Sequence, residues 1–284
     1  AAPPSAAAMG GGDWLHQLGA GPAQVYRVAS ADYMRDPGHI AACPRAREHG
    51  GGVGPDARCG IPQPHQRPRG AFAVSEWSTY TLSDLLMFSA RTYYRLIELY
   101  NVAVWPLHLL AFASGVALVV CALRADERSG RIAAVVLGLC WLWVAWAFHA
   151  ERYATINSAA PYFACAFAVQ GALLIFAGRL RFHRDQFSLG LLLFALFGYP
   201  LLALMSGRPW VQAEMFGMAP DPTAAFTIAL LALAPRASWV LWPLPLLWSA
   251  VSGATLWTMN ARYAWVLALL AMLALSRRIY LDRR

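Results

Sequence analysis

The chain of 284 residues is long enough for one or two ordinary domains, but its composition excludes a soluble one. Hydrophobic residues make up 58% and charged residues only 13%, whereas soluble domains carry roughly 25% charged residues. All 23 basic residues are arginine, a usage typical of a GC-rich bacterial genome. Most of the net charge of +8 lies in short connections beside apolar runs, which indicates membrane orientation and argues against nucleic-acid binding.

Residues 1–73 form a Gly- and Pro-rich leader that we expect to be disordered. The leader has no apolar run long enough for a signal-peptide core. Because Val74 could be a GUG start, our hypothesis is that the leader is upstream sequence read through in error. Two Cys-x5-His pairs in it could serve a zinc site, but chance placement is the better interpretation of this unfamiliar spacing. These pairs are Cys43 with His49 and Cys59 with His65.

Residues 74–100 are predicted to contain an amphipathic helix, with apolar side chains at steps of three and four on one face and charged ones on the other. The apolar face holds Leu82, Leu86, Tyr93, Leu96, Ile97 and Tyr100, and the charged face holds Asp84, Arg91, Arg95 and Glu98. Ser83 is a suitable N-cap. We expect this helix to lie in the membrane interface, and the alternative is a helix packed on the protein's own loops.

Residues 101–284 are predicted to form a transmembrane helical domain with about seven spans, which makes the fold class an all-α polytopic bundle. The apolar runs are 102–123, 132–150, 159–178, 187–206, 223–235, 238–258 and 262–276. The fifth run is short and is followed closely by arginine. It could be a tilted span, or a re-entrant piece shielded by its neighbours.

Arginine placement predicts the orientation of these spans. If all seven segments cross, the cytoplasmic side receives Arg124, Arg128, Arg131, Arg179, Arg181, Arg184, Arg236, Arg277, Arg278, Arg283 and Arg284. The other side receives only Arg91, Arg95, Arg152, Arg208 and Arg262. The positive-inside rule therefore predicts a multi-pass protein of the bacterial inner membrane with its N-terminus outside and its C-terminus in the cytoplasm.

Small residues recur at four-residue steps on two predicted spans and indicate close helix packing. They are Ala160, Ala164, Ala168 and Ala172 in the third span, and Ser249 with Gly253 in the sixth. Packing within one chain is the favoured interpretation, and a homo-oligomer is the alternative. The lipid bilayer is the other expected partner, with no nucleic acid.

Polar residues at the predicted outer ends of the spans are the candidate functional residues, because ionisable groups in membrane segments usually mark function. They are His108, His149, Glu151, Arg152, Asn157, Arg208, Glu214 and Asp221. The predicted topology gathers them on one face of the membrane.

Three functions could use this outer-face group. A transport pathway would need a cavity between His108, His149 and Glu214, lined by proline-broken helices. A metal or haem site would use His108 and His149 with nearby carboxylates, although two histidines are weak evidence. A purely structural group would pair Glu151 or Glu214 with Arg152 or Arg208, leave His149 reaching towards the headgroups, and form a solid bundle.

Several phrases of the sequence resemble an uncharacterised family of bacterial multispanning membrane proteins, the family of unknown function numbered six-zero-six-four. They lie at residues 100–106, 141–149, 156–170, 212–223 and 252–257. The resemblance covers about residues 76–276 and implies no established activity, substrate or catalytic residue. It does imply that the outer-face phrase from Glu214 to Thr223 recurs in related chains.

The spans and loops contain no nucleophile elbow, phosphate loop, zincin helix or dinucleotide fingerprint. We therefore expect no enzyme activity and no cofactor. The sequence predicts an integral inner-membrane protein of unknown molecular function, for which a small-solute permease and an accessory membrane subunit are the candidate roles. The alternative is a metal- or haem-binding membrane protein.

Overall fold

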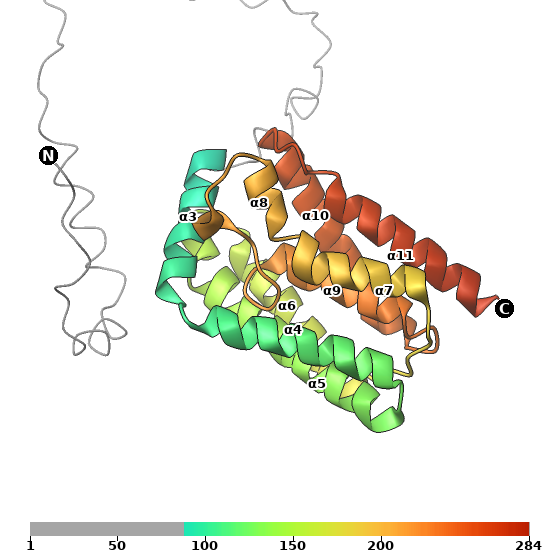
Figure 1. Ribbon diagram of the computed structural model, residues 1–284. Coiled ribbons are helices and arrows are strands. Elements are labelled where there is room, and N and C mark those ends of the chain that lie inside the picture. The colour runs from blue at the N-terminus through green and yellow to red at the C-terminus, as the bar shows by residue number, and fades with distance from the viewer. Residues whose placement is uncertain (1–87, 284) are drawn as a thin grey trace, which may run out of the picture. The chain divides into compact units, whose positions relative to one another are not determined.

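The computed structural model describes residues 88–283, which belong to one compact unit. Every regular element in this part is a helix, which confirms the predicted all-α class (Figure 1). The leader with its Cys–His pairs, the hypothetical start at Val74 and the predicted cap at Ser83 lie outside the described residues.

The amphipathic helix is α3 (Ala90–Ala103), which begins where the Ser89 side chain accepts a hydrogen bond from the Thr92 backbone N–H at 3.2 Å. Its buried residues are the predicted ones: Tyr93, Leu96, Ile97 and Tyr100. This face packs against the protein, including the short helix η5 (Trp210–Gln212). The apolar face of α3 thus contacts the protein itself. The interfacial location of α3 remains a prediction.

Within residues 88–283, four helices are long and apolar enough to cross a membrane, and each corresponds to a predicted apolar run. They are α4 (Leu107–Arg124), the continuous helix Glu127–Thr155, α6 (Ala160–Ala177) and Trp239–Thr258. The second comprises α5 (Glu127–Trp143), the π-helix η2 (Val144–Ala150) and the 3-10 helix η3 (Tyr153–Thr155). The last comprises η6 (Trp239–Leu241) and α10 (Pro243–Thr258).

The other three predicted runs form shorter or broken helices, so seven spans remain a prediction. The run 187–206 divides into α7 (Gln186–Leu193), the π-helix η4 (Phe194–Gly198) and α8 (Leu201–Met205). Pro200 explains the break, because proline removes a backbone donor. The last two runs form α9 (Pro220–Ala232) and α11 (Val266–Asp282).

Helix α9 is the centre of the bundle (Figure 1). All thirteen of its residues are buried, and it packs against α5, α7, α10, α11 and η4. A helix shorter than a bilayer and enclosed in this way is shielded by its neighbours, which is compatible with both a short tilted span and a re-entrant piece. Its position matters for function because its N-terminus carries Asp221.

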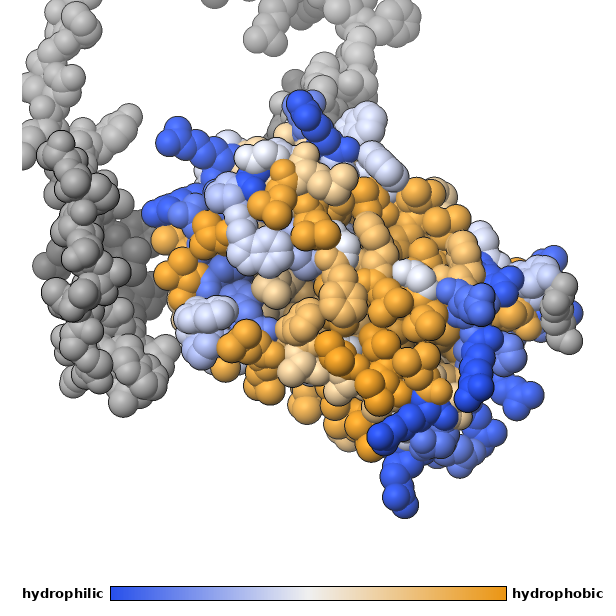
Figure 2. Space-filling view, viewed as in Figure 1, coloured by the Kyte–Doolittle hydropathy of each residue, from blue (hydrophilic) through white to orange (hydrophobic). Residues whose placement is uncertain are grey.

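The outer surface of the bundle is apolar between two polar ends. Figure 2 shows a hydrophobic belt over the helices and hydrophilic side chains gathered at opposite ends. Large apolar side chains stand exposed in this belt, among them Leu110, Phe176 and Leu247. So much exposed apolar area is what lipid would cover.

The connections that carry most of the predicted cytoplasmic arginines lie together at one of these ends. Arg181, Arg236 and Arg277 line a single pocket, and Arg181 also forms an ion pair with Glu127 at the start of α5. The opposite end holds the α10–α11 connection and the segment after α8, which line a second pocket.

Candidate functional site

An irregular segment enters the bundle between η5 and α9 and carries Glu214. Residues 213–219 are non-helical, and all but Met215 are buried. Gly217 has φ +74°, and a Cβ there would lie 3.3 Å from Ala111 of α4 and 3.4 Å from the sulfur of Cys140 of α5. A side chain would therefore meet both backbone strain and crowding at this turn. This segment leads directly into α9, which has only thirteen residues.

Asp221 lies in the first turn of α9 and accepts three side-chain hydrogen bonds. Its Oδ1 accepts from the Trp248 indole N–H at 2.8 Å. Its Oδ2 accepts from the Ser252 hydroxyl at 2.6 Å and from the Tyr199 hydroxyl at 3.2 Å. Ser252 precedes Thr258, the last residue of α10, by six residues, so the carboxylate lies roughly 9 Å below that end of the helix.

Glu214 is the second buried carboxylate of this site, with 3% of its surface exposed. Its Oε1 accepts a hydrogen bond from the Tyr93 hydroxyl of α3 at 3.2 Å. Burial and the negative charge of Asp221 raise the pKa of Glu214 well above its ordinary value, and Arg208 opposes this shift. Burial and the charges of both carboxylates likewise raise the pKa of Tyr93. The site therefore favours a proton on the carboxyl pair, because two neighbouring buried carboxylates resist being charged together.

The two π-helical segments present side chains to this site. His149, near the end of η2, is fully buried, and its ring centroid lies 5.1 Å from that of Trp248, the residue that donates to Asp221. Tyr199 follows η4 directly. Because π-helical turns often occur at functional sites, both departures from α-helix support a functional interpretation of this region. Neither ring nitrogen of His149 has a hydrogen-bond partner among the described residues.

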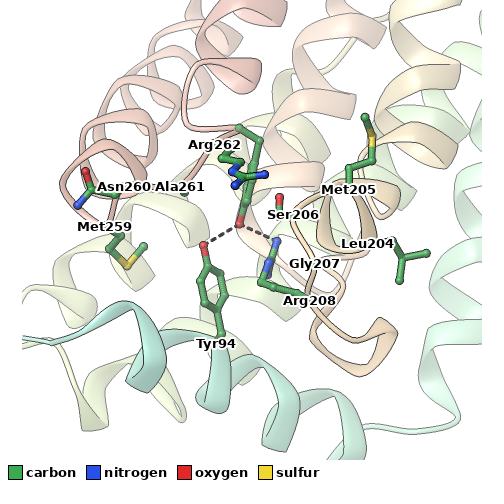
Figure 3. Close-up of a pocket in the computed structure, with 11 residues that line it drawn as sticks. Tyr94, Leu204, Met205, Ser206, Gly207, Arg208, Met259, Asn260, Ala261 and Arg262 are labelled. Carbon is green, nitrogen blue, oxygen red and sulfur yellow. Dashed lines mark hydrogen bonds between the residues drawn. The ribbon is translucent and has the colours of Figure 1, made fainter.

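Arg208 lines a surface pocket (Figure 3), and its charge also acts on Glu214. Its guanidinium donates to the Tyr263 hydroxyl at 2.7 Å and lies 4.1 Å over the Tyr94 ring. The hydroxyls of Tyr94 and Tyr263 are 3.1 Å apart, which closes a three-residue layer. The pocket has a volume of about 570 Å³ and is lined by this layer, Arg262 and others. We call Tyr94, Arg208 and Tyr263 the tyrosine–arginine layer.

The layer is electrostatically coupled to the buried pair behind it. Burial raises the pKa of Tyr94, and so do the charges of Glu214 and Asp221, against the influences of Tyr263 and Arg208. The negative charges of Glu214 and Asp221 thus act on Tyr94, which lines the pocket, although neither carboxylate lines it.

His108 approaches the site through an asparagine. Its Nε2 lies 3.2 Å from Asn101 Oδ1, and the Asn101 amide donates to the backbone carbonyls of Val211 and Ala213. The two hydrogen bonds from Asn101 anchor the segment that carries Glu214 to α3. His108 is 6% exposed, and its Nδ1 has no partner among the described residues.

The eight predicted residues are thus only partly brought together. Glu214, Asp221 and Arg208 interact, while His149 and His108 adjoin them through Trp248 and Asn101. Glu151 and Arg152 are exposed, and Asn157 accepts from the backbone N–H of Ala159.

Two of the alternatives considered from sequence need correction. The structural alternative expected His149 to reach the headgroups and an outer glutamate to pair with Arg152 or Arg208. Instead, His149 is enclosed by aromatic rings, and no such ion pair occurs among residues 88–283. The transport alternative expected a cavity between His108, His149 and Glu214. The pocket described beside the site opens at Arg208 and Tyr263, and aromatic side chains pack around His149.

Sequence reasoning missed the hydroxyl and indole donors Tyr93, Tyr199, Trp248 and Ser252, and the Tyr263 hydroxyl that accepts from Arg208. One signal was present for two of them. Trp248 and Ser252 are four residues apart on the sixth run and therefore share a helix face. Tyr93 was assigned to an apolar face, which its ring occupies while its hydroxyl reaches Glu214.

A metal site receives no support from the arrangement of donors. Among the residues that the structure describes, no group of three or more His, Cys, Asp or Glu side chains is placed to hold a metal ion. The weak candidates His108 and His149 contact different partners, Asn101 and a cluster of aromatic rings.

The described part of the chain is all-helical, and several of its helices are fit to cross a membrane. The chain belongs to the family of unknown function DUF6064, which matches residues 90–283. This match confirms the resemblance seen in the sequence. Searches of curated proteins and of solved structures find no match.

Proposed function

We propose that this protein is a proton-linked small-solute permease of the bacterial inner membrane. The observation that carries the proposal is the buried pair of Glu214 and Asp221 behind a polar surface pocket. A buried carboxyl pair inside an apolar bundle is costly to the fold, which argues for a functional reason to keep it. Carboxyl groups in such places are typical of proton relays in transporters.

The geometry also supports a place for the solute. The pocket beside the tyrosine–arginine layer is large enough for a small molecule, and we infer that the layer closes the way to Glu214, because Arg208 both lines the pocket and acts on Glu214. The described conformation is then the closed one, and movement of Arg208 would join pocket and pair. The irregular segment before the half-length helix α9 resembles the broken helices that form solute sites in secondary transporters.

The proposal includes the seven-span topology with the N-terminus outside and the C-terminus in the cytoplasm. It is supported by the gathering of Arg181, Arg236 and Arg277 at one end of the bundle, as the positive-inside rule requires for the cytoplasmic side. The carboxyl pair then lies towards the outer face. A C-terminal green fluorescent protein fusion should fluoresce, and a C-terminal alkaline phosphatase fusion should be inactive. The reverse pattern would refute this orientation.

Transport is tested with the purified full chain. Thermal-shift screening against a panel of amino acids, small carboxylates, amines and sugars selects compounds that stabilise the protein. Each is then assayed for uptake into proteoliposomes that are more acidic outside than inside. We expect at least one compound whose uptake rises with the imposed pH gradient.

The matched variants are Glu214→Gln, which removes the buried carboxyl, and Glu151→Gln, which removes an exposed one at the same end. Glu214→Gln should abolish the response to the gradient, and Glu151→Gln should retain it. Failure of every compound in the panel to stabilise the protein, or uptake that ignores the gradient in the unmodified protein, would contradict the permease and favour a structural role.

A metal- or haem-binding function is not put forward, because no observation on the described residues favours it.

A further inference from the structure

The pocket lined by Arg181, Arg236 and Arg277 lies at the other end of the bundle from the carboxyl pair and is rich in arginine. Its volume is about 660 Å³, and its charged lining residues are Arg181, Arg184, Arg236, Arg277, Asp185 and Asp282. They come from three separate parts of the chain: the α6–α7 connection, the α9–η6 connection and the end of α11. The pocket is thus a product of the fold and not of one basic stretch.

The carboxylates in and beside this pocket already pair with particular arginines. Arg277 donates to Asp185 at 2.5 Å, and this contact lowers the pKa of Asp185 to about 2, so the carboxylate stays charged. Arg181 is paired with Glu127 of α5. Arg184 and Arg236 have no carboxylate within 4.0 Å among the described residues. The pocket therefore has two guanidinium groups to spare.

A further arginine is buried directly behind the pocket. Arg278 is 2% exposed, and its guanidinium donates to the carbonyl of Ala237, the neighbour of Arg236, at 3.1 Å. The nearest carboxylate, Asp282, is 3.7 Å from its Nη1, and neither Nη1 nor Nε makes a hydrogen bond within residues 88–283. A buried positive charge with so little compensation adds to the positive potential of the pocket, which favours an anion there.

The pocket borders the apolar belt of the bundle. Phe187, Trp239 and Ile279 each lie within three residues of a lining arginine and are exposed. Exposed apolar side chains next to spare guanidinium groups suit a molecule with a charged head and apolar tails. Basic pockets between membrane helices bind the head groups of anionic lipids in this way.

We propose that this pocket binds the phosphodiester headgroup of an anionic phospholipid, with Arg184 and Arg236 as its principal contacts. Guanidinium groups suit phosphate because their planar donors match its oxygens. Lipid binding at this pocket is a separate function from the proposed transport, and the proposal does not depend on the permease proposal. Its role is to seat the bundle in a leaflet that contains anionic lipid.

The test uses the purified full chain in detergent, with native mass spectrometry to count bound lipids. Phosphatidylglycerol is the probe and phosphatidylcholine the zwitterionic comparison. The double variant Arg184→Gln/Arg236→Gln removes the two spare charges. The matched control Arg124→Gln/Arg128→Gln removes two exposed charges from the α4–α5 region, outside the pocket.

We expect the unmodified protein to retain phosphatidylglycerol in preference to phosphatidylcholine. The pocket variant should bind phosphatidylglycerol about tenfold more weakly, since each basic residue near an anionic lipid contributes to attraction. The control variant should bind phosphatidylglycerol less than about threefold more weakly than the unmodified protein. A third variant, Arg184→Lys/Arg236→Lys, keeps both charges and should retain most of the preference, so that misfolding of the glutamine variant does not decide the result.

Three outcomes would overturn the assignment. The first is no preference for phosphatidylglycerol in the unmodified protein. The second is an equal loss of binding in the pocket and control variants, which would reveal only a diffuse effect of charge. The third is displacement of phosphatidylglycerol by equimolar inorganic phosphate, which would make the pocket a site for free phosphate.

Discussion

Replacement of Glu214 by glutamine tests the proton on the buried pair without removing its hydrogen bond. The glutamine oxygen can still accept from the Tyr93 hydroxyl, which lies 3.2 Å from Oε1 in the unmodified protein. The variant therefore changes the ability to titrate and little else in shape. In the unmodified protein, burial and the charge of Asp221 raise the pKa of Glu214 above the value it has when unfolded.

The sign of the effect follows from proton linkage. A carboxyl whose pKa is raised on folding keeps its proton in the folded state at pH values where the unfolded chain has released it. Its stabilising contribution is complete below the ordinary glutamate pKa and is lost as the pH rises through the folded-state pKa. Each pH unit in this window is worth at most about 1.4 kcal/mol, so raising the pH from about 5 to about 7 removes up to about 3 kcal/mol.

The assay is thermal unfolding in detergent at several pH values, read as the difference between the unmodified protein and Glu214→Gln. The unmodified protein should lose melting temperature relative to the variant as the pH rises across this window. Glu151→Gln, which alters an exposed carboxyl, should follow the unmodified protein. Parallel curves for the unmodified protein and Glu214→Gln would refute the conclusion that Glu214 is protonated in the folded state.

Two further substitutions test the contacts that build the site, and a third tests a hydrogen bond between α5 and α9. Trp248→Phe removes the indole donor to Asp221 and should cost about 1.5–3 kcal/mol of stability, since the acceptor is a buried carboxyl, measured by chemical denaturation. Gly217→Ala should cost about 1–2 kcal/mol from its φ of +74° alone, and more from crowding, seen as a lower melting temperature. Thr227→Val leaves the buried Trp141 indole N–H, now 2.8 Å from the Thr227 hydroxyl, without an acceptor, and should cost about 1–3 kcal/mol by the same measurement.

Matched substitutions separate these effects from general ones. Trp257→Phe alters a tryptophan of α10 that is 70% exposed and should leave stability unchanged. Gly190→Ala adds a methyl group where no atom lies within 4 Å and should not destabilise the protein. Losses at these two positions as large as at Trp248 and Gly217 would contradict the contacts inferred from the structure.

The long helices could be predicted from the sequence because each is a continuous apolar run. The predicted runs 132–150, 159–178 and 238–258 each lie within a few residues of the helix observed. Hydrophobicity over about twenty residues is a local property of the chain, so no knowledge of neighbours is needed. The amphipathic face of α3 was predictable for the same reason.

The interior of the site could not be predicted in the same way. Glu214 was placed in an outer loop, where a carboxylate faces water, but the structure buries this segment between α3, α4 and α5. Burial of an irregular segment depends on partners more than a hundred residues away, such as Tyr93, and no local pattern encodes them. Gly217 is the one local sign of a tight turn there.

His149 illustrates the limit set by helix geometry. At the end of the second run, α-helical spacing placed it at the membrane surface. The π-helix η2 changes the spacing over residues 144–150, and the ring packs against Phe167 and Trp248 inside the bundle. The α-helical periodicity of 3.6 residues does not predict a π-helical turn of this kind.

The central claim is that the Glu214–Asp221 pair holds a proton inside the folded protein at neutral pH. Infrared difference spectroscopy of the purified protein measures this directly, because a protonated carboxyl has a carbonyl stretch distinct from that of a carboxylate. We predict a protonated-carboxyl band at neutral pH that persists in Glu151→Gln and is absent from the double variant Glu214→Gln/Asp221→Asn. The absence of the band from the unmodified protein, or its persistence in the double variant, would contradict the claim.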